Sequence, residues 1–317
     1  MRSRPQIMTD HNSSYPPIAI VIPVFNRKDL VSDAIHSALA QTYPKVEVIV
    51  VDDGSKDGTS EELQSFGSRI RLLRQPHRGQ SAARNLGWRS SEAHYILFLD
   101  SDDILEPYAI ECLWKGFRAA EQKDSNWGVS YGEMLTCDSN LNPVKTKPKF
   151  YPSGDVLESL LYENFVRTGT YLVRKSILHE VGGFKEDLDV KEDRLLLFLI
   201  SAHYKFVFVG REVVKYRRHA GPRARKRADK ILAQGTKHLD YFFSAVAPAR
   251  PEITRHKNKL YGLEHISLAK VAWKSALWEE YLYHWKKAHS CRPMLLLNPK
   301  FLMRAFLSSI YKLKKQE

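Results

Sequence analysis

Three carboxylates follow an apolar run in this chain of 317 residues. The run 95–99 has the length and composition of a buried strand, and Asp100, Asp102 and Asp103 come directly after it. Like charges this close repel one another and raise each other's pKa unless a cation neutralises them. Carboxylate oxygens are the ligands that hard divalent cations prefer. The spacing therefore predicts a ligand site at a strand end, with a divalent metal as the neutralising ion.

The segments that must position these acids alternate between short β-rich runs and stretches with helical periodicity. The helical stretches are 30–40, 59–66 and 81–89. Alternation at this spacing predicts a mostly parallel sheet, and such sheets bind ligands in the crevice beyond the carboxyl ends of their strands. The predicted strands are 18–22, 46–51, 70–73 and 95–99, and polar loops follow them at 23–26, 52–55, 75–79 and 100–103.

The second half of the chain has a less regular pattern. The segments 127–131 and 206–209 are predicted strands, and helical patterning dominates from about 228 onward. Between the two strands, regular structure is clear only where a helix is expected. One helix is predicted before these strands, at 107–123, and three are predicted between them, at 156–162, 175–181 and 194–203.

Two common nucleotide-binding loops are missing from the sequence. A dinucleotide-binding fold needs Gly-x-Gly-x-x-Gly after its first strand, where this chain has Pro23-Val24-Phe25-Asn26-Arg27. A phosphate-binding loop of the nucleoside triphosphatase kind needs Gly-Lys-Ser/Thr between glycines, and no such string occurs. The sequence therefore excludes both classes of nucleotide site.

Five strings of residues resemble glycosyltransferase family 2 in their order and spacing. They lie within residues 18–107, and a looser match continues to His219, so the resemblance covers about two thirds of the chain. The strings are Ile22-Pro23-Val24-Phe25-Asn26-Arg27, Gln41-Thr42-Tyr43-Pro44, Val50-Val51-Asp52-Asp53-Gly54-Ser55-Lys56-Asp57-Gly58-Thr59, Gly79-Gln80-Ser81-Ala82-Ala83-Arg84-Asn85-Leu86-Gly87 and Leu99-Asp100-Ser101-Asp102-Asp103.

The resemblance implies an α/β GT-A fold, in which a mostly parallel, Rossmann-like nucleotide-binding sheet is flanked by helices. It also implies inverting transfer of a sugar from a nucleoside-diphosphate sugar, with Mn²⁺ or Mg²⁺ bridging the donor diphosphate as a Lewis acid. The residues carried over are Pro23, Phe25 and Asn26 beside the nucleoside, Asp53 on the base edge with Asp52 next to it, Arg84 near the phosphates, Asp100 facing the ribose or a metal-bound water, and Asp102 as the metal ligand.

An inverting reaction needs a base opposite the leaving group, and the family's acidic pair matches Glu192-Asp193. We take Asp193 as the catalytic base. The alternative is that both acids only occupy the first turn of the following helix, where carboxylates offset the helix dipole by less than about 1 kcal/mol. His219 stays equally open, since it would either approach the metal and phosphates or serve the structure alone.

The formal net charge of +13 implies an anionic partner, and much of the excess lies after residue 214. We expect a flexible N-terminus, a glycosyltransferase domain and a helical basic C-terminal extension. Helical spacing places the apolar residues 302, 306, 310 and 313 on one side of the tail, which fits either a helix on an anionic membrane or a helix docked on the domain. The expected boundaries are 1–17, 18–227 with a donor half 18–107 and an acceptor half 108–227, and 228–317.

No run approaches the roughly 18 apolar residues of a membrane span, and the start of the chain lacks the apolar segment of a secretory signal. Cys112, Cys137 and Cys291 are widely spaced and predict free thiols. We therefore expect a cytoplasmic enzyme, and the membrane alternative for the tail would place it at the inner face of the plasma membrane. It would use a uridine diphosphate sugar and a saccharide or lipid-linked acceptor in cell-surface glycoconjugate synthesis.

Two other functions remain open at this point. One is a noncatalytic module that binds nucleotide sugars or glycans on the same fold. The other is a nucleic-acid-binding protein, although no basic strand interleaved with aromatic residues accompanies the charge. Glycosyl transfer is the function that the acidic residues at 102 and 193 favour.

Overall fold

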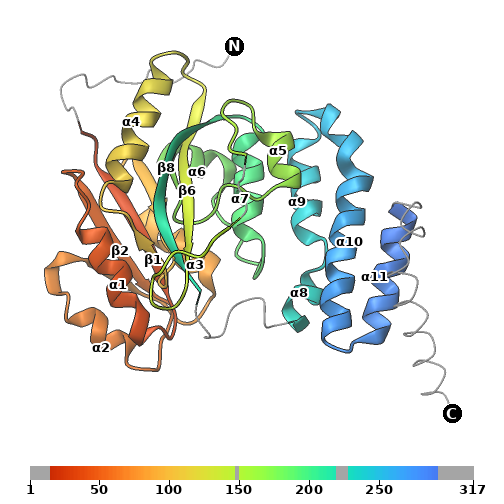
Figure 1. The fold of residues 1–317 in the computed structure, drawn as a ribbon, viewed down its shortest axis with the longest axis horizontal. Coiled ribbons are helices and arrows are strands. Elements are labelled where there is room, and N and C mark those ends of the chain that lie inside the picture. The colour runs from red at the N-terminus through yellow and green to blue at the C-terminus, as the bar shows by residue number, and fades with distance from the viewer. Residues whose placement is uncertain (1–14, 147–149, 219–227, 292–317) are drawn as a thin grey trace.

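The computed structural model describes residues 15–146, 150–218 and 228–291 (Figure 1). Within this part of the chain, eight strands form one sheet in the order β3-β2-β1-β4-β7-β6-β8-β5. The strands β1 to β4 are mutually parallel, as the sequence predicts, whereas β7 is antiparallel to both β4 and β6. The strands are β1 Ile18–Val24, β2 Val46–Asp52, β3 Arg71–Arg74, β4 Tyr95–Phe98, β5 Ile104–Leu105, β6 Trp127–Cys137, β7 Tyr171–Arg174 and β8 Lys205–Arg217.

The helices before residue 202 begin and end close to their predicted limits. The differences after residue 103 lie in the strands, because β5 and β7 were not predicted and the predicted limits of β6 and β8 end too early. The helices are α1 Lys28–Leu39, α2 Thr59–Gln64, α3 Gln80–Ser90, α4 Ala109–Glu121, α5 Leu157–Tyr162, α6 Lys175–Val181 and α7 Glu192–Ser201, and a 3₁₀ turn, η1, covers Gly67–Arg69.

Both faces of the sheet are buried, and strand β1 shows how the sequence brings this about. Ile18, Ile20 and Ile22 pack on the face covered by α1 and α4, whereas Ala19 and Val21 pack on the face covered by α3. Side chains alternate between the faces of a strand, so a continuous apolar run is needed where helices cover both. This double cover leaves the strand ends as the place for polar groups.

Helix α3 lies very close to the sheet, and a glycine permits the approach. A Cβ atom at Gly87 would stand 2.4 Å from Cγ1 of Val21, which is far inside van der Waals contact. A larger residue would push the helix away from β1. Gly87 therefore fixes the height at which α3 carries its polar side chains over the carboxyl ends of the strands.

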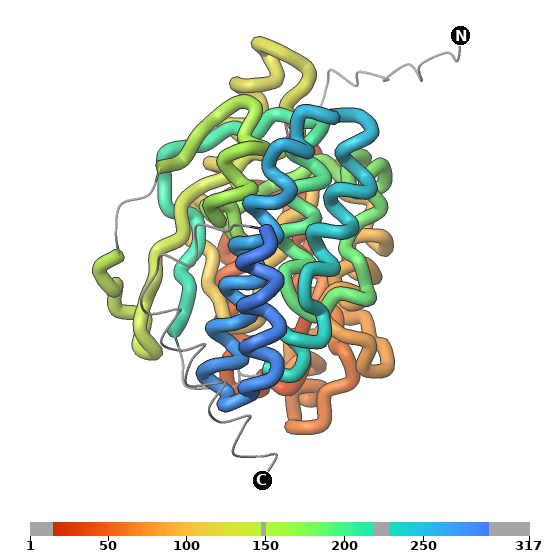
Figure 2. The backbone as a smooth tube through the Cα atoms, turned by 90° about the vertical axis from the view of Figure 1, so that its right-hand side faces the viewer, coloured from red at the N-terminus to blue at the C-terminus, as the bar shows by residue number. Residues whose placement is uncertain are grey.

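The helices after residue 227 lie side by side beyond α7 (Figures 1 and 2). Helix α9 packs on α7 through the rings of Phe242 and Phe198, whose centroids are 5.2 Å apart. Within the described ranges, no helix is both long enough and apolar enough to cross a membrane. The elements are α8 Ala228–Gln234, α9 Lys237–Val246, the 3₁₀ helix η3 Pro251–His256, α10 Lys257–Lys274 and α11 Trp278–Cys291.

Candidate active site

The loops after β1 and β2 are joined by a pair of hydrogen bonds. The amide of Asn26 donates to Oγ of Ser55 over 3.0 Å, and the amide of Lys56 donates to Oδ1 of Asn26 over 2.8 Å. Asn26 has a φ of 51°, in the left-handed region that asparagine tolerates better than most residues. Pro23 is buried in β1 opposite Val51. The predicted nucleoside residues of the first loop therefore stand beside the loop that carries Asp52 and Asp53.

Asp52 and Asp53 are both buried and have different partners. Asp52 Oδ1 accepts from the amide of Ser55 over 2.9 Å, and Ser60 Oγ donates to its other oxygen. Asp53 accepts from the amides of Arg78 and Gly79 over 2.8 and 2.9 Å. Asp52 thus closes its own turn, while Asp53 shapes the loop between β3 and α3.

The ring of Phe25 is partly exposed and stacks on His77. The ring centroids are 3.9 Å apart and the planes differ by 20°. His77 Nδ1 also lies 2.8 Å from Oδ2 of Asp53. An aromatic surface beside a carboxylate is suited to a planar base, because the ring supplies stacking and the carboxylate accepts hydrogen bonds.

Arg84 connects two carboxylates that are far apart in the sequence. Its Nη2 donates to Oδ1 of Asp100 over 2.7 Å and its Nη1 donates to Oε1 of Glu192 over 2.8 Å. The side chain of Arg84 is 3% exposed and that of Glu192 is 5% exposed, so this ion pair is shielded from water. Charge-assisted hydrogen bonds of this kind are strong and directional. Arg84 therefore fixes the start of α7 against the end of β4.

Asp102 and Asp103 complete the acidic cluster. Asp103 is buried and accepts a hydrogen bond from the amide of Arg217 over 3.2 Å, whereas the side chain of Asp102 is 24% exposed and lies 4.0 Å from Nε of Arg27. Desolvation, followed by the charges of Asp100 and Asp102, raises the pKa of Asp103 well above its usual value. Desolvation also raises the pKa of Asp100, and Arg84 opposes that rise.

Burial and mutual repulsion raise the pKa values of Asp100 and Asp103, and an added cation would oppose that rise. The donor atoms of the cluster are all oxygens, which Mg²⁺ and Mn²⁺ prefer as ligands. No group of three or more ligating side chains in the described residues is arranged as a complete metal site. A cation held by Asp102 would therefore take most of its ligands from outside the protein. The carboxylate oxygens of the cluster are nevertheless donor atoms of the type that such a cation binds.

Glu192 and Asp193 both lie in the first turn of α7, as the helix-dipole alternative requires. Their partners differ, however. Glu192 accepts from Arg84 and from Gln80 Nε2, which is 2.6 Å away, and burial together with Asp193 raises the pKa of Glu192 to about 7. Asp193 is half-buried and accepts from the amide of Arg194 over 2.7 Å. Glu192 is thus part of a buried hydrogen-bond network with Arg84 and Gln80.

Sequence reasoning placed Arg84 near the phosphates but missed what the rest of its motif does. Nδ2 of Asn85 donates to the carbonyl of Phe184 over 2.8 Å, and Oδ1 of Asn85 accepts from the amide of Phe184 over 3.0 Å. Ser81 Oγ donates to the carbonyl of Leu188 over 3.2 Å. The motif therefore docks the segment that precedes α7, which carries Glu192. Polar residues at helical spacing were the signal that could have indicated this docking.

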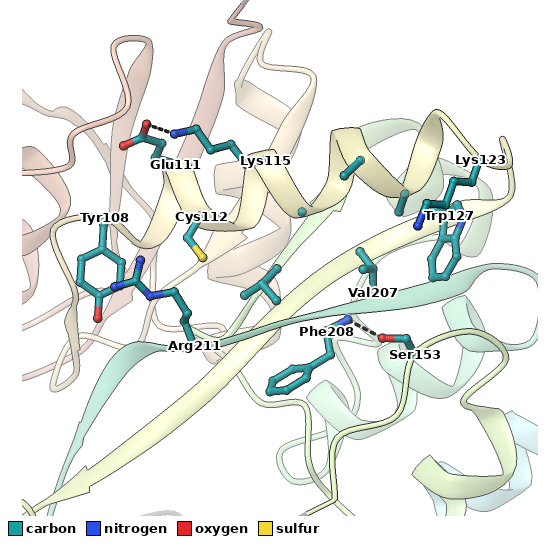
Figure 3. Close-up of a pocket in the computed structure, with 14 residues that line it drawn as sticks. Tyr108, Glu111, Cys112, Lys115, Lys123, Trp127, Ser153, Val207, Phe208 and Arg211 are labelled. Atoms are coloured by element: carbon teal, nitrogen blue, oxygen red, sulfur yellow. Dashed lines mark hydrogen bonds and ion pairs between the residues drawn. The ribbon is translucent and has the colours of Figure 1, made fainter.

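A cavity of about 630 Å³ lies elsewhere, between α4 and β8 (Figure 3). The guanidinium of Arg211 lies 4.3 Å from the ring centroid of Tyr108 at one end, and Trp127 stands at the other. None of the predicted site residues lines it. His219 and the amphipathic tail lie outside the described residues.

The family model for glycosyl transferase family 2 matches residues 19–181, half of the chain. The chain belongs to glycosyl transferase family 2. An uncharacterised glycosyltransferase of Rickettsia conorii is 33% identical over 215 residues, which are 66% of this chain and 35% of that protein. The glycosyltransferase GlyG of Streptococcus pneumoniae is 27% identical over 64% of this chain and 71% of its own length.

The chain also resembles a solved structure in its fold. S. aureus TarS, residues 1–349, in complex with UDP-GlcNAc, superposes with a TM-score of 0.55 over 87% of this chain and 89% of that one, at 18% identity. The predicted GT-A fold is confirmed by this likeness, and the described part of the C-terminal extension, 228–291, is helical as expected. The chain spans about a third of the length of the first Rickettsia relative, so the likeness does not extend to that whole protein.

Proposed function

We propose that this glycosyltransferase moves a sugar, with inversion at the anomeric carbon, from a uridine diphosphate sugar to a hydroxyl group of an acceptor. The observation that carries the proposal is the bridge of Arg84 between Asp100 and Glu192. It brings the acids of the donor strand next to the acidic pair at the start of α7. Donor activation and proton removal would then occur at one place.

The nucleobase of the donor would bind against Phe25, with Asp53 at the edge of the nucleobase. Pro23 and Asn26 would lie beside the nucleoside. Phe25 is 38% exposed although it is a large apolar residue, which suits a surface that a ligand covers. The related TarS fold was solved with UDP-GlcNAc, and this supports a uridine nucleotide here. Asp52, which closes the turn, would support Asp53 from behind.

A divalent cation would be held by Asp102, with Asp100 nearby, and the remaining ligands would come from the diphosphate and water. When bound, it would supply Lewis-acid stabilisation of the departing nucleoside diphosphate. Arg84 would contribute further positive charge close to the phosphates. Asp193 would remove the proton of the acceptor hydroxyl, because Glu192 is already engaged by Arg84 and Gln80.

The acceptor would be a saccharide or a lipid-linked saccharide of the cell surface, presented to a cytoplasmic enzyme at the inner face of the plasma membrane. The basic charge after residue 214 supports an anionic partner of this kind. Sedimentation of the full chain and of a 1–295 variant with anionic vesicles tests the membrane contact. If neither the full chain nor the 1–295 variant sediments with the vesicles, the membrane contact is refuted.

Release of nucleoside diphosphate from a panel of UDP-, GDP- and dTDP-sugars, with Mn²⁺ and with EDTA, tests the proposed reaction. We expect Mn²⁺-dependent release from a UDP-sugar and its loss in Asp102→Asn. Asp138→Asn, an acid in the turn after β6 and outside the site, serves as the control and should retain turnover. Binding of UDP without any turnover would show a noncatalytic module and would refute the proposed reaction.

A further inference from the structure

The segment 186–191, which leads into Glu192, is held by helices that lie beyond the sheet. Residues from α8, α9 and α10 contact positions 187, 189, 190 and 191. Figure 1 shows α9 next to α7, with α10 on the far side of α9. All three helices follow residue 181, where the family match ends. The segment that delivers the acidic pair is therefore positioned by parts of this chain outside the matched region.

The outer anchors are partly exposed ion pairs and hydrogen bonds. Nζ of Lys237 lies 2.6 Å from Oδ2 of Asp187, and Tyr241 donates its hydroxyl to the same carboxylate. These hydrogen bonds from Lys237 and Tyr241 lower the pKa of Asp187. Nζ of Lys230 lies 2.8 Å from Oδ2 of Asp189. Exposed contacts of this kind contribute little singly, but two ion pairs and a hydrogen bond on one short loop together limit its motion.

The inner anchors reach the backbone and the last residue before α7. Oε1 of Gln234 accepts from the amide of Val190 over 3.1 Å. Lys191 donates from Nζ to Oε1 of Glu264 on α10, whose side chain is 7% exposed. Loss of one partner from a buried pair leaves the charge of the other partner uncompensated. A substitution at Glu264 should therefore cost more free energy than a substitution at one of the exposed contacts.

Lys191 also marks a sharp change in chain direction. Its φ of 63° is in the left-handed region, which is strained for an L-residue other than glycine. Its carbonyl accepts the first helical hydrogen bond of α7, from Leu195 over 2.9 Å. The turn at Lys191 therefore directs Glu192 toward Arg84, and its side chain must be held for the turn to persist.

His238 of α9 lies on the other side of Glu264, with Nε2 at 3.7 Å from Oε2. Desolvation and the charges of Lys191 and Arg194 hold the pKa of His238 well below its usual value. The imidazole is therefore neutral near pH 7. Lys191 and Arg194 are the cations whose charges act on the Glu264 carboxylate, and Lys191 is the one that donates a hydrogen bond to it.

We propose that helices α8 to α10 set the position of Asp193 and Glu192, and that Glu264 is the decisive positioning residue, acting through Lys191. The inference rests on the proposed function, since it assigns Asp193 as the base. The proposed donor contacts lie on the loops after β1, β2 and β4 and at Arg84, and Arg84 keeps its hydrogen bond to Asp100 when Glu192 moves. Loss of the anchor should therefore impair the chemical step and leave donor binding intact.

Four variants test the proposal. Glu264→Gln removes the charge that holds Lys191, and Lys191→Gln combined with Glu264→Gln replaces the ion pair with two amides that can bond to each other. Lys237→Met removes an outer anchor. Lys259→Met is its matched control, because Lys259 links α10 to the ring of Tyr162 at 4.1 Å and does not contact the loop.

We expect Glu264→Gln to lower kcat by about 10- to 100-fold with KM for the donor changed less than about twofold, since a misplaced base costs rate and not donor affinity. The double variant should recover part of that loss. Lys237→Met should lower kcat by a few fold, and Lys259→Met should not change it. Amide hydrogen exchange should become faster at 187–193 in Glu264→Gln and stay unchanged in strands β1 to β4.

Two results would overturn the inference. The first is normal kcat in Glu264→Gln together with faster exchange at 187–193. The second is unchanged exchange at 187–193 in Glu264→Gln and Lys237→Met. Failure of the proposed function has a different signature, since the unmodified chain would then release no UDP from any donor. The exchange measurement decides the anchoring in either case.

Discussion

Arg84 donates to Glu192 over 2.8 Å in a buried ion pair that joins α3 to the start of α7. The same guanidinium donates to Asp100 at the end of β4. Its pKa is raised by these two acids against the effect of burial, so the side chain is a permanent cation. One arginine thereby connects the two groups of acids that the proposed reaction uses.

Replacement of Arg84 by lysine keeps the charge and removes the fork. A lysine ammonium cannot hold both carboxylates in the same geometry, so one buried acid loses its partner. We expect the free energy of unfolding to fall by about 1–3 kcal/mol and turnover to fall with it. Urea denaturation and UDP release measure the two effects. Arg89→Lys, a half-exposed site on the same helix, should change the free energy by less than about 0.5 kcal/mol. Equal effects at both positions would contradict the bridge.

Glu192 gives stability a pH dependence of predictable sign. Its pKa is about 7 in the folded chain, above the ordinary glutamate value of 4.5, so the folded protein binds the proton more tightly than the unfolded chain does. The stabilisation is complete below about pH 4.5 and is lost as the pH rises through 7. Glu192→Gln should reduce the difference in unfolding free energy between pH 5 and pH 8 by at most about 3 kcal/mol. Urea titrations at both pH values test this, and an identical pH dependence in variant and parent would refute it.

Asp193→Asn separates proton removal from donor binding. A positioned general base contributes about 10²- to 10⁴-fold, so turnover should fall by that factor. Calorimetric titration with UDP and Mn²⁺ should give an unchanged affinity. The titration is the internal control, since a misfolded variant would lose both properties. Normal turnover would remove Asp193 from the reaction.

Asp53→Asn tests the loop between β3 and α3. The carboxylate accepts from the amides of Arg78 and Gly79, and an asparagine amide can replace only one acceptor oxygen. We expect a loss of about 1–3 kcal/mol in stability and weaker UDP binding. Asp57→Asn, an exposed acid in the neighbouring turn, should leave UDP affinity unchanged. Equal UDP affinity in the two variants would count against Asp53 as part of the nucleotide site.

The first half of the sheet was predictable because its signals are local. Apolar runs of four to seven residues give strands β1, β2 and β4, and each is followed by the polar residues that form the site. Strand β7 was missed because Tyr171–Arg174 has four residues and runs directly into α6, so no turn residue marks its end. Its position between β4 and β6 depends on pairings that no local pattern contains.

The candidate site was predictable by residue type and less so by contact. The acids at 100, 102 and 193 could be named from their strings, but the pairing of Arg84 with Glu192 spans 108 positions. The sequence around Glu192 is compatible with two roles, an acid that offsets the dipole of α7 and an acid in a buried network. Burial and the partner across the fold, which only the structure supplies, distinguish the two.

The antiparallel strand β7 has a consequence for synthesis on the ribosome. Until residues 171–174 emerge, the edge of β4 that pairs with β7 is open at Tyr95, Ile96 and Leu97, three residues that are buried in the folded chain. Unpaired strand edges of this composition associate with one another, and domains fold from the N-terminus as they are made. A nascent chain stopped short of Arg174 would therefore be prone to aggregation, whereas a few further residues would seal that edge.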